Sequence, residues 1–141
     1  MGAEFIKIEK VRFQHTDAAG IVFYPRFLEM LNGLVEDWFE EALHLPFKAL
    51  HQTAGVPTVD LQVQFKKAAR LGDLLTKKLW VITIGNSSVV YGFCFMNTNE
   101  ICIQGQATLV FVKYTEDKSA IFSQHWTAEL KSGMELYLIN K

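Results

Sequence analysis

The feature that most limits how this chain can fold is a single change of hydrophobic period. Apolar residues recur at helical spacing over residues 25–43, about five turns, and the proline at the start suits the first position of a helix. From residue 59 to about residue 69 the period becomes two, as in a half-buried strand. The sequence therefore predicts one long helix followed by strands in its first 120 residues.

Short polar turns divide the following region into three more strands. We predict these at residues 74–84, 89–96 and 101–112, and an earlier strand at residues 5–13. Consecutive strands with tight turns favour an antiparallel meander. The order predicts an α+β domain in which a five-stranded antiparallel sheet wraps around a long central helix.

The segments between and after these elements are predicted from turn and capping signals. Residues 44–55 are expected to be irregular or to form a short helix, and residues 114–119 form a polar connection. A C-terminal helix is expected over residues 127–138, with Thr127 as its N-cap and Glu129 in its first turn.

Composition excludes several classes of protein. A chain of 141 residues suits a single domain, and a formal net charge of -1 gives no electrostatic basis for binding nucleic acid or an anionic membrane. Its apolar runs are too short to cross a bilayer, and residues 1–10 lack the apolar segment of a secretion signal. Cys94 and Cys102 lie in apolar strand segments without a C-x-x-C spacing, so we expect reduced thiols in a cytoplasmic protein.

Familiar catalytic and metal-binding motifs are absent. The sequence has no G-x-S-x-G elbow, no phosphate-binding glycine pattern and no H-E-x-x-H pair. Its four histidines are scattered, without a Cys/His spacing typical of a metal site. We therefore expect neither a metal ion nor a bound cofactor.

One carboxylate, Asp17, precedes the predicted central helix by a small-residue turn. A helix N-terminus carries unpaired N–H groups and partial positive charge, which can stabilise a carbonyl oxygen during nucleophilic attack. A carboxylate beside it would attack that carbonyl or deprotonate a water. The alternative is that Asp17 only caps the turn or pairs with Arg26.

The sequence around Asp17 resembles a known signature. Residues 15–27, H-T-D-A-A-G-I-V-F-Y-P-R-F, follow V-R-F and precede the long helix. This pattern resembles the 4-hydroxybenzoyl-CoA thioesterase group of hotdog-fold acyl-CoA thioesterases. The resemblance covers a core of about residues 5–113 in a single domain of residues 1–141, and residues 114–141 form a C-terminal extension.

The resemblance implies a function and roles for particular residues. The family hydrolyses acyl-CoA thioesters, and its D-x-A-G aspartate, the catalytic carboxylate, corresponds to Asp17. The backbone N–H that polarises the thioester carbonyl corresponds to that of Tyr24. Coenzyme A is then part of the substrate, and the acyl group would be aromatic, of hydroxybenzoyl type, or short. Family members form homodimers or homotetramers with active sites between subunits.

Other residues are candidates for supporting the site. In an extended chain His15 would share a side with Asp17 and tune it or act as a base, unless it only satisfies local hydrogen bonds. Gly20, with two alanines, would keep the approach to the backbone open. Lys66, Lys67 and Arg70, with Lys77 and Lys78 on the next strand, would hold coenzyme A phosphates, although most such charges are only solvated.

Aromatic residues are candidates for binding the acyl group. Phe23 and Phe27 lie next to the predicted site, and further aromatic residues lie on the fourth strand. Of the two roles, packing in the core is the one that we assign first to Phe27. Thr58 and Asp60 would approach a neighbouring subunit's site.

Two other functions remain open at the level of the sequence. The same fold supports hydration or dehydration of a hydroxyacyl thioester, which would need His15 as base and Glu29 or Glu36 as acid. A module that binds acyl-CoA without catalysis is the other alternative.

Overall fold

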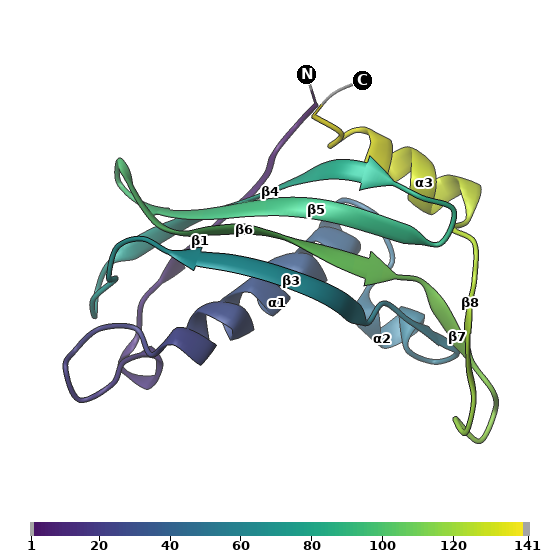
Figure 1. Ribbon diagram of the computed structural model, residues 1–141, viewed down its shortest axis with the longest axis horizontal. Helices are drawn as coiled ribbons and strands as arrows, with labels where there is room; N and C mark the ends of the chain where they lie inside the picture. The colour runs from purple at the N-terminus through teal and green to yellow at the C-terminus, as the bar shows by residue number, and fades with distance from the viewer. Residues whose placement is uncertain (1, 140–141) are drawn as a thin grey trace.

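The fold of the protein is described from a computed structural model, which covers residues 2–139. One antiparallel sheet has five strands in the order β1-β4-β5-β6-β3, and helix α1 (Tyr24–Glu41) runs beneath it (Figure 1). The strands are β1 (Phe5–Lys10), β3 (Thr58–Phe65), β4 (Leu74–Ile84), β5 (Ser88–Asn97) and β6 (Glu100–Val110). The predicted α+β hotdog arrangement, a sheet wrapped around a long helix, is confirmed.

The core lies between α1 and the inner face of the sheet. Strand β5 shows the reason: alternate side chains of a strand point to the same face, and here Tyr91, Phe93 and Phe95 all turn inward and are buried. Trp38 and Phe39 of α1 are fully buried opposite the sheet. Each fully buried side chain of this size contributes about 1.5–3 kcal/mol, so this interface dominates the stability of the domain.

The first strand is shorter than predicted. β1 ends at Lys10, and Phe13–His15 form a 3-10 turn in which Phe13 is 82% exposed. Val11 is still bonded to the residue before β4, since its N–H donates to the Asp73 carbonyl at 2.8 Å, and the chain turns away from the sheet only after it. Helix α1 starts at Tyr24, one residue early, so Pro25 occupies the second helical position.

A second, smaller sheet was not predicted. Strands β2 (Ala54–Gly55), β7 (Val112–Tyr114) and β8 (Ile121–Ser123) pair in the order β2-β7-β8, next to the short helix α2 (Phe47–Leu50). These strands have two or three residues each, too few to show a period in the sequence. The predicted fifth strand is divided at Phe111 into β6 and β7.

The C-terminal helix confirms the capping prediction. In α3 (Ala128–Glu135) the Leu130 N–H donates to the Thr127 side-chain oxygen at 3.1 Å, and Glu129 lies in the first turn. Leu130 and Met134 join the main hydrophobic core. Figure 1 shows both chain ends on this side of the molecule.

Strand β3 is far more exposed than the half-buried strand that was predicted. Within residues 2–139 it is an edge strand that pairs only with β6, and Val59, Leu61 and Phe65 are 60%, 40% and 51% exposed. An unpaired, apolar edge of this kind is a template for another strand.

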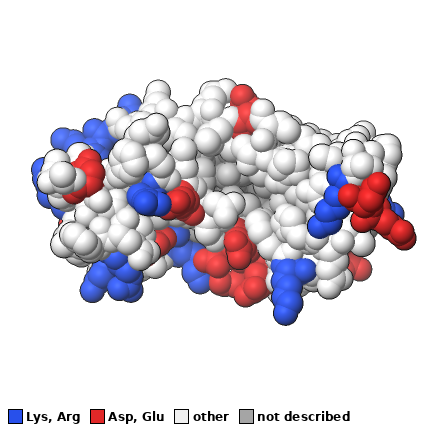
Figure 2. All heavy atoms as spheres, turned by 90° about the horizontal axis from the view of Figure 1, so that it is seen from below, with Lys and Arg blue, Asp and Glu red and all other residues white. Residues whose placement is uncertain are grey.

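The surface has no extended field of one charge on the side shown in Figure 2. Basic and acidic side chains lie there in small separate groups, and uncharged side chains occupy much of the middle. Cys94 and Cys102 are free and buried, as predicted. No helix within residues 2–139 has the length and apolar character needed to span a membrane.

Candidate active site

Asp17 lies at the tip of a small hairpin before α1. Thr16 pairs with Val22, and the Asp17 N–H donates to the Ile21 carbonyl at 2.9 Å. The turn closes through Gly20, whose φ of +80° lies in the left-handed region that favours glycine. The conformation of the turn therefore depends on Gly20, and the space that it leaves is open because nothing lies within 4 Å of an added Cβ.

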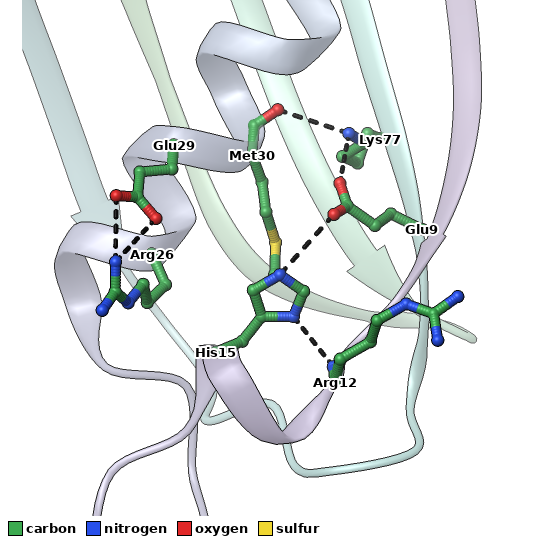
Figure 3. A network of polar contacts seen from close by, with 7 residues as sticks. All are labelled: Glu9, Arg12, His15, Arg26, Glu29, Met30 and Lys77. Carbon is green, nitrogen blue, oxygen red and sulfur yellow. Dashed lines mark hydrogen bonds and ion pairs between the residues drawn. The ribbon is translucent and has the colours of Figure 1, made fainter.

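The Asp17 carboxylate is exposed and only partly engaged. Its Oδ1 accepts the Ala19 N–H at 2.8 Å, and Oδ2 has no hydrogen-bond partner in residues 2–139. Arg26 does not pair with it, because the Arg26 guanidinium binds both carboxylate oxygens of Glu29 at 3.0 Å (Figure 3). Of the two structural alternatives, turn capping is therefore present and the Arg26 pair is absent. One carboxylate oxygen is left available for chemistry.

The start of α1 supplies a free N–H group next to this hairpin. The Phe23 N–H donates to the His15 carbonyl at 2.9 Å, which ties the helix start to the base of the hairpin. No hydrogen-bond acceptor within the described part of the chain meets the Tyr24 N–H, the first of the helix. An N–H at this position is also favoured by the helix dipole as a donor to an anion.

The connection between β3 and β4 joins the same end of the molecule. The Val22 N–H donates to the Ala69 carbonyl at 2.8 Å, and Ile21 pairs with Arg70. These bonds place Arg70 beside the Asp17 hairpin, although the two are separated by some fifty residues of sequence. Lys66 and Lys67 lie in the same connection, directly after β3, so the three predicted cations lie at the end that carries Asp17.

A hollow of about 230 Å³ borders the first turn of α1. Its walls include Tyr24 and Phe27 on the helix, Phe65 at the end of β3, and Lys66 and Lys67 directly after it. The Tyr24 and Phe65 rings lie edge to face with centroids 6.0 Å apart. The two lysines are exposed, and Lys67 also lies 3.5 Å from Glu100. A hollow with an apolar wall and a cationic rim suits a ligand that carries both kinds of group.

The aromatic candidates divide into exposed and buried residues. Phe23 is 46% exposed beside the helix start, whereas Phe27 is 4% exposed and packs in the core, as expected. Phe27 nevertheless forms part of the wall of the 230 Å³ hollow.

His15 does not share a side with Asp17. Its ring is buried because the 3-10 turn, Phe13–His15, replaces the extended chain on which that prediction relied. His15 Nδ1 accepts the Arg12 N–H at 2.8 Å, which leaves the proton of a neutral ring on Nε2, 3.8 Å from a Glu9 oxygen (Figure 3). No hydrogen bond within residues 2–139 joins His15 to Asp17.

Glu9 links His15 to a buried lysine. The other Glu9 oxygen accepts from Lys77 Nζ at 2.7 Å, and the same ammonium donates to the Met30 carbonyl of α1 at 3.3 Å (Figure 3). Lys77 is only 4% exposed, so it does not lie at a pocket mouth and is not available to hold phosphate. This group of charges instead connects β1, β4 and α1 beneath the hairpin.

A second cavity, of about 320 Å³, lies further along α1. Its walls come from α1, α2, β3, β5 and β6, and combine apolar side chains with polar ones. Leu28, Leu31 and Val35 form the helix side, and Tyr91 reaches it from β5. The sequence suggested Tyr91 only as one of several aromatic residues on its strand. The inward direction of its side chain follows from the register of β5.

Two exposed apolar residues near Asp17 were missed by the sequence argument. Phe13 and Leu71 are 82% and 56% exposed and border the surface hollow that contains Asp17, Ala18 and Gly20. Phe13 was assigned to a strand and Leu71 to a turn. No periodic pattern could reveal them, because they meet only when the hairpin approaches the β3–β4 connection.

Comparison with known proteins identifies a family. The model of the thioesterase-like superfamily matches residues 11–130. A search of curated proteins finds no significant match.

Several solved structures share the fold. The dynemicin thioesterase has a TM-score of 0.89 at 15% identity, over 99% of this chain and 100% of that chain. A 1,4-dihydroxy-2-naphthoyl-CoA thioesterase from Synechocystis has a TM-score of 0.80 at 20% identity, over 94% and 96%. The gentisyl-coenzyme A thioesterase BH1999 has a TM-score of 0.79 at 21% identity, over 89% and 98%.

Proposed function

Because the chain belongs to the thioesterase-like superfamily, we propose that it hydrolyses acyl-CoA thioesters to a free acid and coenzyme A. The observation that carries the proposal is that Asp17 and the Tyr24 N–H both keep unused hydrogen-bonding capacity at the entrance of α1. A half-free carboxylate and an unpartnered helix N–H belong to two segments that the Phe23–His15 hydrogen bond ties together.

In the proposed reaction the thioester carbonyl oxygen accepts from the Tyr24 N–H. Negative charge builds on this oxygen as the carbonyl carbon becomes tetrahedral, and one such donor is worth about 3–4 kcal/mol in the transition state. The C–S bond then breaks, and coenzyme A leaves as a thiolate that takes up a proton. The positive end of α1 supports the same charge.

Asp17 has two chemically balanced roles in this scheme. Its free oxygen attacks the carbonyl carbon, forming an anhydride that a water then hydrolyses to regenerate the carboxylate. Alternatively, Asp17 accepts a proton from a water that attacks directly. Single-turnover hydrolysis in ¹⁸O-water separates them, since only the anhydride route allows label to enter Asp17.

The substrate is proposed to lie along the path from the cationic rim to the cavity. Lys66, Lys67 and Arg70 would contact the phosphates of coenzyme A, with Arg70 able to bind in a bidentate way. Phe23 and Phe27 would flank the thioester, and the 320 Å³ cavity would take the acyl group. Two structural relatives are named for aromatic acyl-CoA substrates, which supports an aromatic acyl group here.

A homodimer, or a homotetramer built from two dimers, is proposed as the active form. The exposed β3 edge supports this, because a second copy would pair with its free backbone groups and cover Val59, Leu61 and Phe65. Thr58 and Asp60 on this edge would then approach the neighbouring copy's site. Sedimentation or light scattering tests the assembly, and a monomer that is active at all concentrations would contradict it.

The proposed reaction needs neither a metal ion nor a bound cofactor. Within residues 2–139 no three His, Cys, Asp or Glu side chains are grouped to hold a metal. Activity that survives exhaustive chelation would support the proposal, and activity restored by an added metal would contradict it. A cytoplasmic location remains a prediction from the free thiols.

A thiol-release assay over a panel of acyl-CoA substrates tests the function. The panel contains benzoyl, hydroxybenzoyl, short-chain and long-chain acyl-CoA. We expect release of coenzyme A, with the highest kcat/KM for an aromatic member. Tight binding without thiol release would instead indicate a binding module, and formation of an enoyl thioester would indicate a dehydratase. The last would need a carboxylic acid on α1, where Glu29 is engaged by Arg26.

A further inference from the structure

The cavity beside the middle of α1 is large enough for a ring system. A cavity of about 150 Å³ in a protein core can bind benzene, so about 320 Å³ has room for one or two rings. Its wall includes apolar side chains, among them Leu31, Val35, Leu61 and Leu109. An apolar acyl group would therefore be bound mainly by these contacts.

Tyr91 is the buried polar residue of this wall, whereas the other polar residues that line the cavity are exposed or half-buried: Asn32, His51, Thr58 and Tyr114. The Tyr91 side chain is 2% exposed, and its hydroxyl makes no hydrogen bond to any group in residues 2–139. Among the side-chain nitrogen and oxygen atoms of residues 2–139 that are inaccessible to solvent, only Trp38 Nε1 lacks a hydrogen-bond partner. The Tyr91 hydroxyl does not belong to this inaccessible set. The Tyr91 hydroxyl also lacks a hydrogen-bond partner but keeps some accessible surface, so a molecule in the cavity that Tyr91 lines can reach it.

A buried hydroxyl without a protein partner has a definite energetic consequence. The penalty of leaving it unsatisfied is avoided only if something in the cavity bonds to it. Burial also raises the pKa of the Tyr91 phenol above its usual range, so it stays neutral and can both donate and accept. An occupant with an oxygen at this point satisfies the hydroxyl, whereas a wholly apolar occupant displaces water and leaves it unpaired.

The cavity lies at a suitable distance from the proposed reaction centre. Leu28, Leu31 and Val35 follow Tyr24 by four, seven and eleven residues on the helix. At 1.5 Å per residue, they lie about 6, 10 and 16 Å along the axis from the Tyr24 N–H. An acyl group whose carbonyl is held at that N–H therefore has its far end, not its thioester end, in this cavity.

We propose that Tyr91 is a specificity-determining residue, whose hydroxyl hydrogen-bonds to an oxygen substituent at the far end of a one- or two-ring acyl group. This inference rests on the proposed hydrolysis of aromatic acyl-CoA thioesters and adds the residue that distinguishes acyl groups with an oxygen remote from the thioester from those without one. It also assigns the selection among them to one atom, Tyr91 Oη.

The test compares matched substrate pairs in three proteins. The pairs are benzoyl-CoA with its 3- and 4-hydroxy derivatives, and 2-naphthoyl-CoA with 6-hydroxy-2-naphthoyl-CoA. The proteins are the wild type, Tyr91→Phe and Tyr137→Phe. The control removes a phenol hydroxyl from a residue that packs against Phe5 and Trp38 and does not line the cavity.

We expect the wild type to prefer at least one hydroxylated member over its parent by about three- to tenfold in kcat/KM, the range of one net hydrogen bond. Tyr91→Phe should abolish this preference, mainly through a lower kcat/KM for the hydroxylated member, and Tyr137→Phe should retain it. Equal losses on both members of a pair, or a preference that survives in Tyr91→Phe, would overturn the inference.

Two further measurements separate this inference from the function and from misfolding. Thermal unfolding of Tyr91→Phe should match the wild type, because the hydroxyl has no protein partner to lose; a clear loss of stability would count against the inference. Calorimetric binding of the free acids gives a readout without catalysis. If no substrate releases thiol, the proposed function fails, yet tighter binding of the hydroxylated acid by the wild type than by Tyr91→Phe still supports the role of Tyr91.

Discussion

The two ends of α1 differ in how completely a single chain covers them. At the C-terminal end Trp38 and Phe39 are fully buried, and the Trp38 ring lies edge to face with Phe39 and Tyr137. At the N-terminal end Phe23 and Tyr24 are 46% and 58% exposed. Apolar surface left in water adds nothing to the stability of one chain. One end therefore serves stability, and the other keeps apolar surface for binding.

The largest effect is expected from Asp17→Asn at the exposed end. Turnover should fall about a hundred- to ten-thousandfold, the range for a positioned acid or base. Thermal unfolding should not change, because the side chain is exposed and asparagine can still accept the Ala19 N–H. Asp37→Asn, which removes one negative charge from the other half of α1, is the control in the thiol-release assay. Near wild-type turnover in Asp17→Asn would remove Asp17 from the mechanism.

At the packed end, Trp38→Ala should lower the free energy of unfolding by about 3–5 kcal/mol. A cavity opens where no water enters and where rings on both sides lose their contacts. Phe23→Ala is the matched change at the exposed end, and its cost in stability should be below about 1 kcal/mol. Urea unfolding measures both. Equal losses of unfolding free energy in the two variants would show that the two ends of α1 are equally well packed, which would contradict the difference between them.

Lys77→Met is expected to have an intermediate effect, since it acts beneath the hairpin. It leaves Glu9, whose side chain is one-third exposed, without its partner, so we expect a loss of about 1–3 kcal/mol after allowance for solvent. The double variant Lys77→Met with Glu9→Gln should recover part of the loss in urea unfolding. Additive losses would show that the Glu9–Lys77 bond contributes little.

The smallest effect concerns the two thiols. Burial raises the pKa of Cys94 and Cys102 above the ordinary 9.0, so native protein should react with thiol reagents more slowly than unfolded protein. The stability linked to these groups is fully present below pH 9.0 and is lost as the pH rises through the higher folded pKa. Reaction kinetics in native buffer and in urea measure this. Rapid native reaction would show that the strands carrying them open readily.

The sequence revealed those parts of the fold that depend on neighbours along the chain. The limits of β4 were predicted to the residue, since a regular period of two between polar turns requires no distant partner. Thr127 was predicted as an N-cap from three adjacent positions. The strands of the small sheet could not be predicted in this way, because two or three residues are too few to show a hydrophobic period.

The site residues also divide into those predictable from neighbours along the chain and those that depend on distant contacts. Asp17 and the Tyr24 N–H lie within one short motif, so the sequence could name them together. The assignment of His15 to Asp17 failed because a 3-10 turn reversed its ring, and Lys77 was expected at a surface although its charge is neutralised inside by Glu9. Both errors concern side-chain direction, which depends on a register that no local pattern specifies.

The sequence alone thus determined a long helix, four strands after it and a carboxylate at the helix entrance, since these follow from hydrophobic period and a contiguous motif. Tertiary structure decided the rest: that Arg70 lies beside the hairpin, that β3 is an exposed edge, and that Tyr91 turns its hydroxyl toward a cavity. These depend on contacts between segments far apart in the chain. Such contacts arise when the sheet closes around α1, and only then does the opening motif lie beside Arg70.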